Sequence, residues 1–204
     1  KRTEVLAYLD ILIRENTNAE DANMIAFANG LYNIVDDSFV AFTPEHIITN
    51  KIRWDYNPEA YSELADKTLN KIACDDPAIR ALLEEAIGYC FYRRNELGKA
   101  FILTGDKSNG KSTFLSMVQA LLGDENIASL DLKELGDRFK TAEMFGKLAN
   151  IFADLPSRSI DDNGMFKALT GEDFITAERK NKDPFSFRPY ARFLFSCNEI
   201  PRNY

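Results

Sequence analysis

A short stretch of the chain combines glycine, lysine and serine at a spacing that suits phosphate binding. Residues 105–112 read Gly-Asp-Lys-Ser-Asn-Gly-Lys-Ser and match the pattern G-x-x-x-x-G-K-[ST] at every fixed position. The glycines let successive backbone N–H groups face an anion, and the helix expected to follow adds partial positive charge. The predicted nucleotide-binding residues are Gly105, Asp106, Lys107, Ser108, Asn109, Gly110, Lys111, Ser112 and Thr113.

Two side chains of this loop have separate expected roles at a bound phosphate chain. Lys111 is expected to reach the terminal phosphates as a point charge. The Ser112 hydroxyl is expected to bind a Mg²⁺ ion that is held mainly by phosphate and water oxygens. A chance glycine-rich turn before a helix is the alternative, but the apolar run over 100–104 before the loop and the helical pattern after it favour a phosphate loop.

Polar side chains also follow two other apolar runs further along the chain. Asp154 ends the run over 148–153, and Asn198 ends the run over 193–197. Open α/β sheets bind ligands at the carboxyl ends of their strands, so a carboxylate there suits a metal ion and an amide suits a water molecule or the γ-phosphate. Asp and Asn are also common turn residues after a strand, and that reading stays open for each residue.

Charge and composition limit the partners that the chain can have. It carries 25 Lys and Arg against 32 Asp and Glu, a formal charge of −7, which disfavours indiscriminate wrapping of nucleic acid. Any DNA contact is therefore expected to be local, and residues 177–192 hold five basic residues against two acidic ones. The three cysteines lack C-x-x-C spacing, and no apolar run approaches the ~20 residues that cross a bilayer. With no secretory signal visible, we expect a cytoplasmic protein without membrane contact.

From residue 97 onward, strand and helix patterns alternate, as in an α/β fold with a largely parallel sheet. The pattern predicts strands over 100–104, 126–130, 148–153 and 190–196. It predicts helices over 111–122, 131–144 and 159–169, and a hairpin over 173–188 before the last strand.

The first 96 residues read differently, as a smaller α+β leader domain. An amphipathic helix is predicted over 3–15, and the Asn29-Gly30 pair between two apolar runs predicts a hairpin. Further strands are expected near 39–42 and 47–54, followed by helices over 58–73 and 77–95. We therefore expect two domains, 1–96 and 97–204.

Together these segments resemble the superfamily 3 helicases, which are AAA+ ATPases of the phage and poxvirus primase-helicase type. The resemblance covers about residues 97–201 and is looser upstream, at 25–30 and 55–58. It is carried by residues 105–113, Gly146-Lys147 with the strand to Asp154, residues 167–173 and residues 195–201. It implies a P-loop AAA+ type parallel sheet flanked by helices, which follows the leader domain in the sequence.

The resemblance also implies an activity and its residues. It makes Lys111, Asp154 and Asn198 the catalytic residues, with ATP as substrate and with Mg²⁺ held at Ser112 and Asp154. It implies ATP hydrolysis coupled to single-stranded DNA translocation by a homo-oligomeric ring, expected to be a hexamer, with other replication proteins as further partners. A phage protein of this type would act in the host cell cytoplasm. The DNA contacts that it implies lie on the hairpin, at Arg179, Lys180, Lys182 and Phe185; a solvated hairpin without a ligand is the alternative.

Two departures from the family pattern leave functions open. Many relatives end the second strand with two acids, but here Ala153 precedes Asp154, so the general base is not assigned. The chain begins at Lys1 and stops six residues after Asn198, so we expect a piece of a longer protein that lacks the arginine finger and hydrolyses ATP poorly alone. A P-loop kinase without a DNA partner and a non-catalytic replication adaptor remain alternatives.

Overall fold

The computed structural model describes residues 4, 22–46, 48–155 and 164–199, and its contacts divide the chain into two compact units, Lys1–Tyr56 and Asn57–Tyr204. The helix predicted over 3–15 lies outside the described residues apart from Glu4, as does the first part of the helix predicted over 159–169. The division of the units lies well before residue 96. The domain division 1–96 and 97–204 stays a prediction.

The first unit contains a small antiparallel sheet. It is formed by β1 (Met24–Phe27), β2 (Gly30–Asn33) and β3 (Phe39–Val40), in that order. Phe27 pairs with Gly30 across the turn, which confirms the hairpin predicted at the Asn-Gly pair. The prediction of a strand near 47–54 is wrong for the described residues 48–54. Their backbone makes isolated hydrogen bonds to β1 and its turn, such as Ile52 N to Ala26 O at 2.8 Å, and no continuous ladder.

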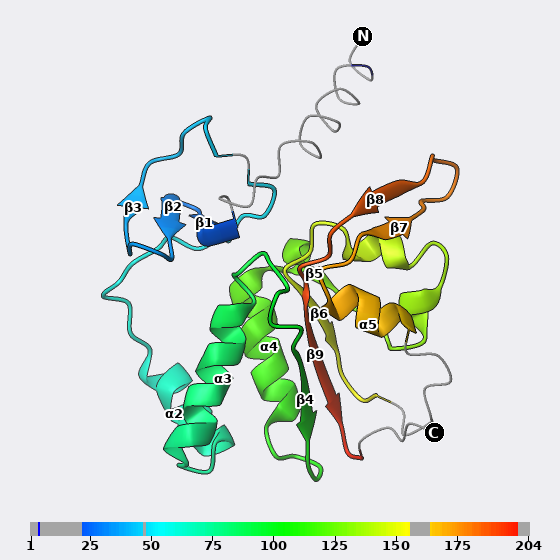
Figure 1. Cartoon of the computed structure of the whole chain (residues 1–204). Coiled ribbons are helices and arrows are strands. Elements are labelled where there is room, and N and C mark those ends of the chain that lie inside the picture. The colour runs from blue at the N-terminus through cyan, green and yellow to red at the C-terminus, as the bar shows by residue number, and fades with distance from the viewer. Residues whose placement is uncertain (1–3, 5–21, 47, 156–163, 200–204) are drawn as a thin grey trace. The chain divides into compact units, whose positions relative to one another are not determined.

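The second unit is built on a four-stranded parallel sheet (Figure 1). Its strands run in the order β4 (Ala100–Thr104), β9 (Arg192–Cys197), β6 (Ala149–Phe152) and β5 (Ile127–Ala128). All four confirm predicted strands. Because the strands are parallel, their carboxyl ends lie at one edge, which is where the predicted polar side chains follow.

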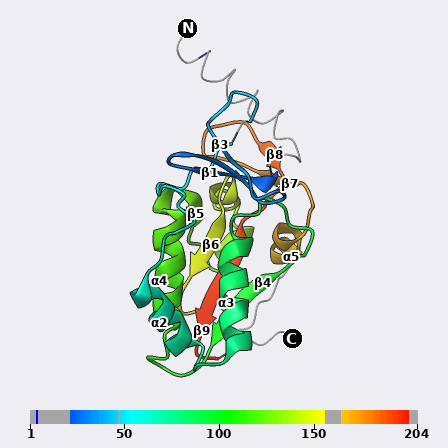
Figure 2. The ribbon, with the colours of Figure 1, turned by 90° about the vertical axis from the view of Figure 1, so that its left-hand side faces the viewer.

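Helices cover both faces of this sheet. Helices α3 (Pro77–Tyr89) and α4 (Lys111–Leu122) lie on one side and α5 (Gly164–Thr170) lies on the other; Figure 2 looks from the side of α3 and α4. Helix α4 has the predicted bounds, whereas α3 ends at Tyr89 and not at 95. The mixed α/β class with a parallel sheet is therefore confirmed. None of the helices within the described part of the chain is long and apolar enough to span a bilayer.

The helix predicted over 131–144 is wrong. This segment forms two short 3₁₀ helices, η3 (Glu134–Gly136) and η4 (Thr141–Met144), with extended backbone at Asp137 between them. Gly136 is a poor residue for a helix interior, and the Thr141 hydroxyl donates to the Leu135 carbonyl oxygen at 2.7 Å, a local bond that competes with a continuous helix.

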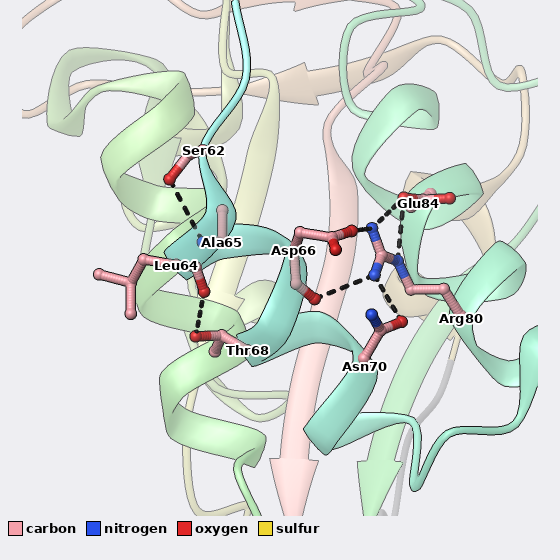
Figure 3. A network of polar contacts seen from close by, with 8 residues as sticks. All are labelled: Ser62, Leu64, Ala65, Asp66, Thr68, Asn70, Arg80 and Glu84. Carbon is pink, nitrogen blue, oxygen red and sulfur yellow. Dashed lines mark hydrogen bonds and ion pairs between the residues drawn. The ribbon is translucent and has the colours of Figure 1, made fainter.

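Helices α2 (Glu63–Ile72) and α3 are joined by one arginine (Figure 3). The Arg80 guanidinium donates to the Asp66 carboxylate at 2.9 Å, to the Asn70 side-chain oxygen at 2.7 Å and to the Glu84 carboxylate at 2.7 and 2.9 Å. Ser62 caps α2 by accepting from the Ala65 N–H at 3.3 Å, so the helix begins later than position 58. The bonds of Arg80 hold the middle of α2 against α3.

A two-stranded antiparallel hairpin precedes the last strand of the sheet, as predicted. It is formed by β7 (Ile175–Ala177) and β8 (Phe185–Phe187), in which Ile175 pairs with Phe187 and Ala177 with Phe185. These four side chains are buried in the main core cluster of the second unit.

Candidate nucleotide-binding cleft

The loop between β4 and α4 reaches the helix through a glycine with a positive φ. Gly110 stands immediately before α4 with φ of 92°, a conformation that favours glycine. A Cβ atom at Gly110 would lie 2.8 Å from Cγ1 of Ile72, at the end of α2, so the position also lacks room for a side chain. No side chain of the loop caps α4. The first N–H groups of α4 therefore lack a side-chain partner, as at helix ends that bind anions.

Lys111 lies over its own loop. Its ammonium group donates to the carbonyl oxygens of Gly105 at 2.6 Å and Asp106 at 2.8 Å, and to the Asn109 side-chain oxygen at 3.0 Å. An ammonium group has three hydrogens, so these three oxygens use its full donor capacity. The charge of Lys111 is thus held at the loop by oxygens that phosphate oxygens can replace.

The loop, Asp154 and Asn198 meet around one cleft of about 900 Å³. Strand β9 lies between β4 and β6, and Asp154 and Asn198 follow the carboxyl ends of β6 and β9. The Asp154 N–H donates to the Ser196 hydroxyl at 3.3 Å, and the Leu155 N–H donates to the Ser196 carbonyl oxygen at 2.8 Å. These bonds join the two strand ends, and they leave the Asp154 side chain exposed on the cleft wall.

The cleft gathers most of the residues that the sequence singled out. Its lining residues are Lys107, Ser108, Asn109, Gly110, Lys111, Ser112, Thr113, Asp154, Leu155, Asn198 and Glu199. Gly105 and Asp106 do not line it but supply carbonyl oxygens to Lys111. Sequence reasoning missed Glu199, although its place directly after a predicted strand-end residue was a signal for it. The cleft therefore contains a second carboxylate besides Asp154.

The four predicted DNA contacts of the hairpin differ in how exposed they are. Lys180 and Lys182 are exposed. Arg179 is half-buried, with its guanidinium 5.0 Å from the ring centre of Phe185. Phe185 is only 8% exposed and meets the ring of Phe145 edge-on at 5.2 Å, so its ring cannot stack on a base. The four DNA contacts stay a prediction, and the burial of Phe185 on the same side of the hairpin as its cross-strand partner argues against a stacking role for its ring.

Arg192, one of the five basic residues counted in the 177–192 segment, is fully buried at the start of β9. Its guanidinium donates to the carbonyl oxygens of Tyr89, Tyr92 and Arg94 and to the Asn95 side-chain oxygen. Burial lowers the pKa of Arg192 to about 10. This side chain connects the sheet to the segment after α3, and it adds nothing to the charge of the surface.

Of the three cysteines, Cys74 is exposed. Cys90 and Cys197 are buried, and burial raises the pKa of both thiols, that of Cys90 to about 12. Within the described residues, no group of three or more His, Cys, Asp and Glu side chains is placed to hold a metal ion.

A family model described as "Family of unknown function (DUF5906)" matches residues 103–204, half of the chain, and the chain belongs to this family. A second model, described as "D5 N terminal like", matches residues 1–88. The first match contains the whole candidate cleft.

The chain is similar to viral proteins and to solved structures. It is 27% identical over 192 residues to "Putative helicase L207/L206" of Acanthamoeba polyphaga mimivirus and 26% identical over 202 residues to "Putative helicase 184R" of Invertebrate iridescent virus 6. Each match covers 89% of the chain and 20% of the relative, so the chain spans about a fifth of these proteins. The apo structure of the NrS-1 C terminal region (305-718) aligns with a TM-score of 0.56 at 14% identity, over 86% of the chain and 54% of that structure. At this identity the likeness is one of fold.

Proposed function

We propose that this chain is part of an ATP-driven DNA helicase of a viral or phage replication protein, of the primase-helicase type with a P-loop AAA+ core. The observation that carries the proposal is the meeting of the glycine-rich loop, Asp154 and Asn198 around one cleft. The names of the viral relatives, which describe helicases, support the same class.

ATP suits the cleft in size and in chemistry. A volume of about 900 Å³ falls in the range of small-molecule sites, and the uncapped start of α4 offers N–H groups to phosphate oxygens. Lys111 would exchange its three loop oxygens for phosphate oxygens. Asn198 would hold the attacking water or the γ-phosphate, because its amide both donates and accepts without adding charge.

Mg²⁺ also fits the oxygen donors of the cleft. Ser112 and Asp154 are the protein ligands that we assign to it, with phosphate and water oxygens supplying the rest, as Mg²⁺ prefers. The ion would neutralise charge that develops on the phosphates. With Asp154 at the metal, Glu199 is the other carboxylate of the lining and is our candidate for activating water.

The whole protein is proposed to work as a ring, expected to be a hexamer, on single-stranded DNA. Lys180 and Lys182, exposed between β7 and β8, are proposed to neutralise backbone phosphates. Half-buried Arg179 adds a third positive charge to this part of the hairpin. A neighbouring subunit would supply the arginine that completes the ATP site.

Nucleotide binding by the chain is the first test. A nonhydrolysable ATP analogue with Mg²⁺ should bind in calorimetry, and Lys111→Ala should weaken it at least tenfold, since charge-assisted bonds contribute about 1.5–3 kcal/mol each. Lys107→Ala is the matched control, because Lys107 lies in the same loop at a position that the pattern leaves open; a much smaller loss is expected. Equal affinity of wild type and Lys111→Ala would favour the adaptor.

Catalysis is tested with the full-length protein. Single-stranded DNA should stimulate its ATP hydrolysis, and Lys111→Ala should abolish both the basal and the stimulated rate. A requirement for a soluble phosphoryl acceptor, with no effect of any DNA, would favour the kinase.

A further inference from the structure

The β7–β8 hairpin has one buried face and one exposed face. Its buried face is formed by the two cross-strand pairs already described. Successive side chains of a strand point to opposite faces, so the residues next to these four lie on the other face of the hairpin. The exposed side chains there are Phe174, Thr176, Ser186 and Arg188.

Phe174 and Arg188 form a pair at one end of this exposed face. They lie immediately outside the Ile175–Phe187 pair, and the Arg188 guanidinium is 4.6 Å from the ring centre of Phe174. Phe174 nevertheless remains 65% exposed. Next to it, the hydroxyls of Thr176 and Ser186 are hydrogen-bonded to each other at 3.1 Å. A single exposed phenylalanine is ordinary, but here an open ring, a guanidinium and two hydroxyls share one narrow face.

The charge of the hairpin favours an anionic partner. Glu178 is engaged by Arg138, with an N–O distance of 2.7 Å. Among the described residues, no carboxylate lies within ion-pair distance of Lys180, Lys182 or Arg188. The remaining acids of the hairpin are Asp173 and Asp183, and both are exposed. These two carboxylates are fewer than the three cations Lys180, Lys182 and Arg188.

Single-stranded nucleic acid matches this set of groups. An exposed aromatic ring stacks on any base. A guanidinium or ammonium group contacts the phosphate that links this nucleotide to the next one. An acidic peptide would use the cations but would leave the ring without a flat partner. A duplex would keep its bases stacked on one another and out of reach of the ring.

We propose that Phe174 stacks on one base of a bound single strand and that Arg188 contacts the adjacent phosphate. This inference rests on the proposed DNA-binding function and adds residues to it. The strand then follows the exposed hairpin face from Phe174 toward Lys180 and Lys182.

Fluorescence anisotropy with a labelled oligo-dT strand tests the stacking contact. Phe174→Leu, which keeps an apolar side chain but removes the ring, should weaken binding by roughly tenfold. Phe174→Tyr should retain wild-type affinity. Phe139→Leu is the matched control: Phe139 is 45% exposed beneath Arg138, but Glu178 neutralises that arginine, so no change in affinity is expected.

An abasic strand of the same length separates stacking from charge. Without bases to stack, the wild type and Phe174→Leu should bind it with equal affinity. An unchanged affinity of Phe174→Leu for oligo-dT would overturn the inference, and so would an equal loss on both strands. A shift of Phe174→Leu from oligomer to monomer in sedimentation, without a change in DNA affinity, would also overturn it and would make the face an interface between copies.

The two proposals fail in different ways. If the wild type binds no single strand at all, the proposed function itself fails. If Lys180→Ala weakens binding and Phe174→Leu does not, only the stacking contact is wrong. Circular dichroism spectra that match the wild type establish that each variant is folded.

Discussion

Replacing the buried Arg192 with methionine should destabilise the second unit strongly. The guanidinium donates four hydrogen bonds, to the carbonyl oxygens of Tyr89, Tyr92 and Arg94 and to the Asn95 side chain. Hydrogen bonds from a charged group contribute about 1.5–3 kcal/mol each, so together they stabilise by roughly 6–12 kcal/mol. Burial lowers the pKa of Arg192 from 12.5 to about 10, and this net shift corresponds to about 3 kcal/mol against the charged form. The net loss expected for Arg192→Met is therefore at least about 3 kcal/mol.

Urea unfolding followed by circular dichroism measures this loss. Arg192→Lys keeps the charge but has fewer donors, each in a different direction, so it should lose less than Arg192→Met. Arg138→Met is the matched control, because its ion pair with Glu178 is formed by a side chain that is 72% exposed; the loss there should stay below about 1 kcal/mol. A free energy of unfolding for Arg192→Met within 1 kcal/mol of the wild type would refute the reasoning, since the four bonds would then only offset the cost of burial.

Three other perturbations address the cleft and the first unit. Gly110→Ala places a Cβ atom 2.8 Å from Ile72 at a φ of 92°, so nucleotide affinity should fall at least tenfold; calorimetry in which this variant binds as the wild type does would contradict the loop geometry. Asp154→Asn should leave the nucleotide affinity measured without Mg²⁺ unchanged, and it should remove most of the increase in affinity that Mg²⁺ gives. An unaltered increase would exclude Asp154 as a ligand of Mg²⁺. Tyr32 donates to Asp37, and this bond raises its pKa to about 12, so the stability that it adds is present below pH 10 and lost as the pH rises through 12. Tyr32→Phe should therefore be less stable than the wild type at pH 9 and should approach it above pH 12 in thermal unfolding; a difference independent of pH would contradict this linkage.

Glycine residues made the loop over 105–110 predictable from the sequence. The strand over 100–104 and the helix over 111–122 were predicted with their observed bounds, because Gly105 and Gly110 mark both ends of the loop between them. The hairpin at Asn29-Gly30 was predictable for the same reason. These elements are set by residues that are close in the chain, so a pattern of spacing contains enough information.

Elements that depend on distant contacts were not predictable in the same way. The helix predicted over 131–144 does not form, because Gly136 and a hydrogen bond from Thr141 back to Leu135 divide the segment. Phe185 was selected as an aromatic residue near cations, although the strand alternation that buries it also exposes Phe174. The burial of Arg192 leaves no signal in the local sequence, because its four partners lie about 100 positions earlier.

Helix α2 lies in the same compact unit as the loop before α4, and a Cβ atom at Gly110 would lie 2.8 Å from Cγ1 of Ile72. Helix α2 belongs to the stretch matched by the "D5 N terminal like" model, yet its last residue lies against the loop that belongs to the family match over 103–204. The Arg80 bonds hold α2 to α3 (Figure 3). We therefore expect a change that loosens α2 to shift the backbone at Gly110 directly. Helices α2 and α3 therefore belong to the unit that contains the candidate cleft, although the "D5 N terminal like" match over residues 1–88 ends before that cleft begins.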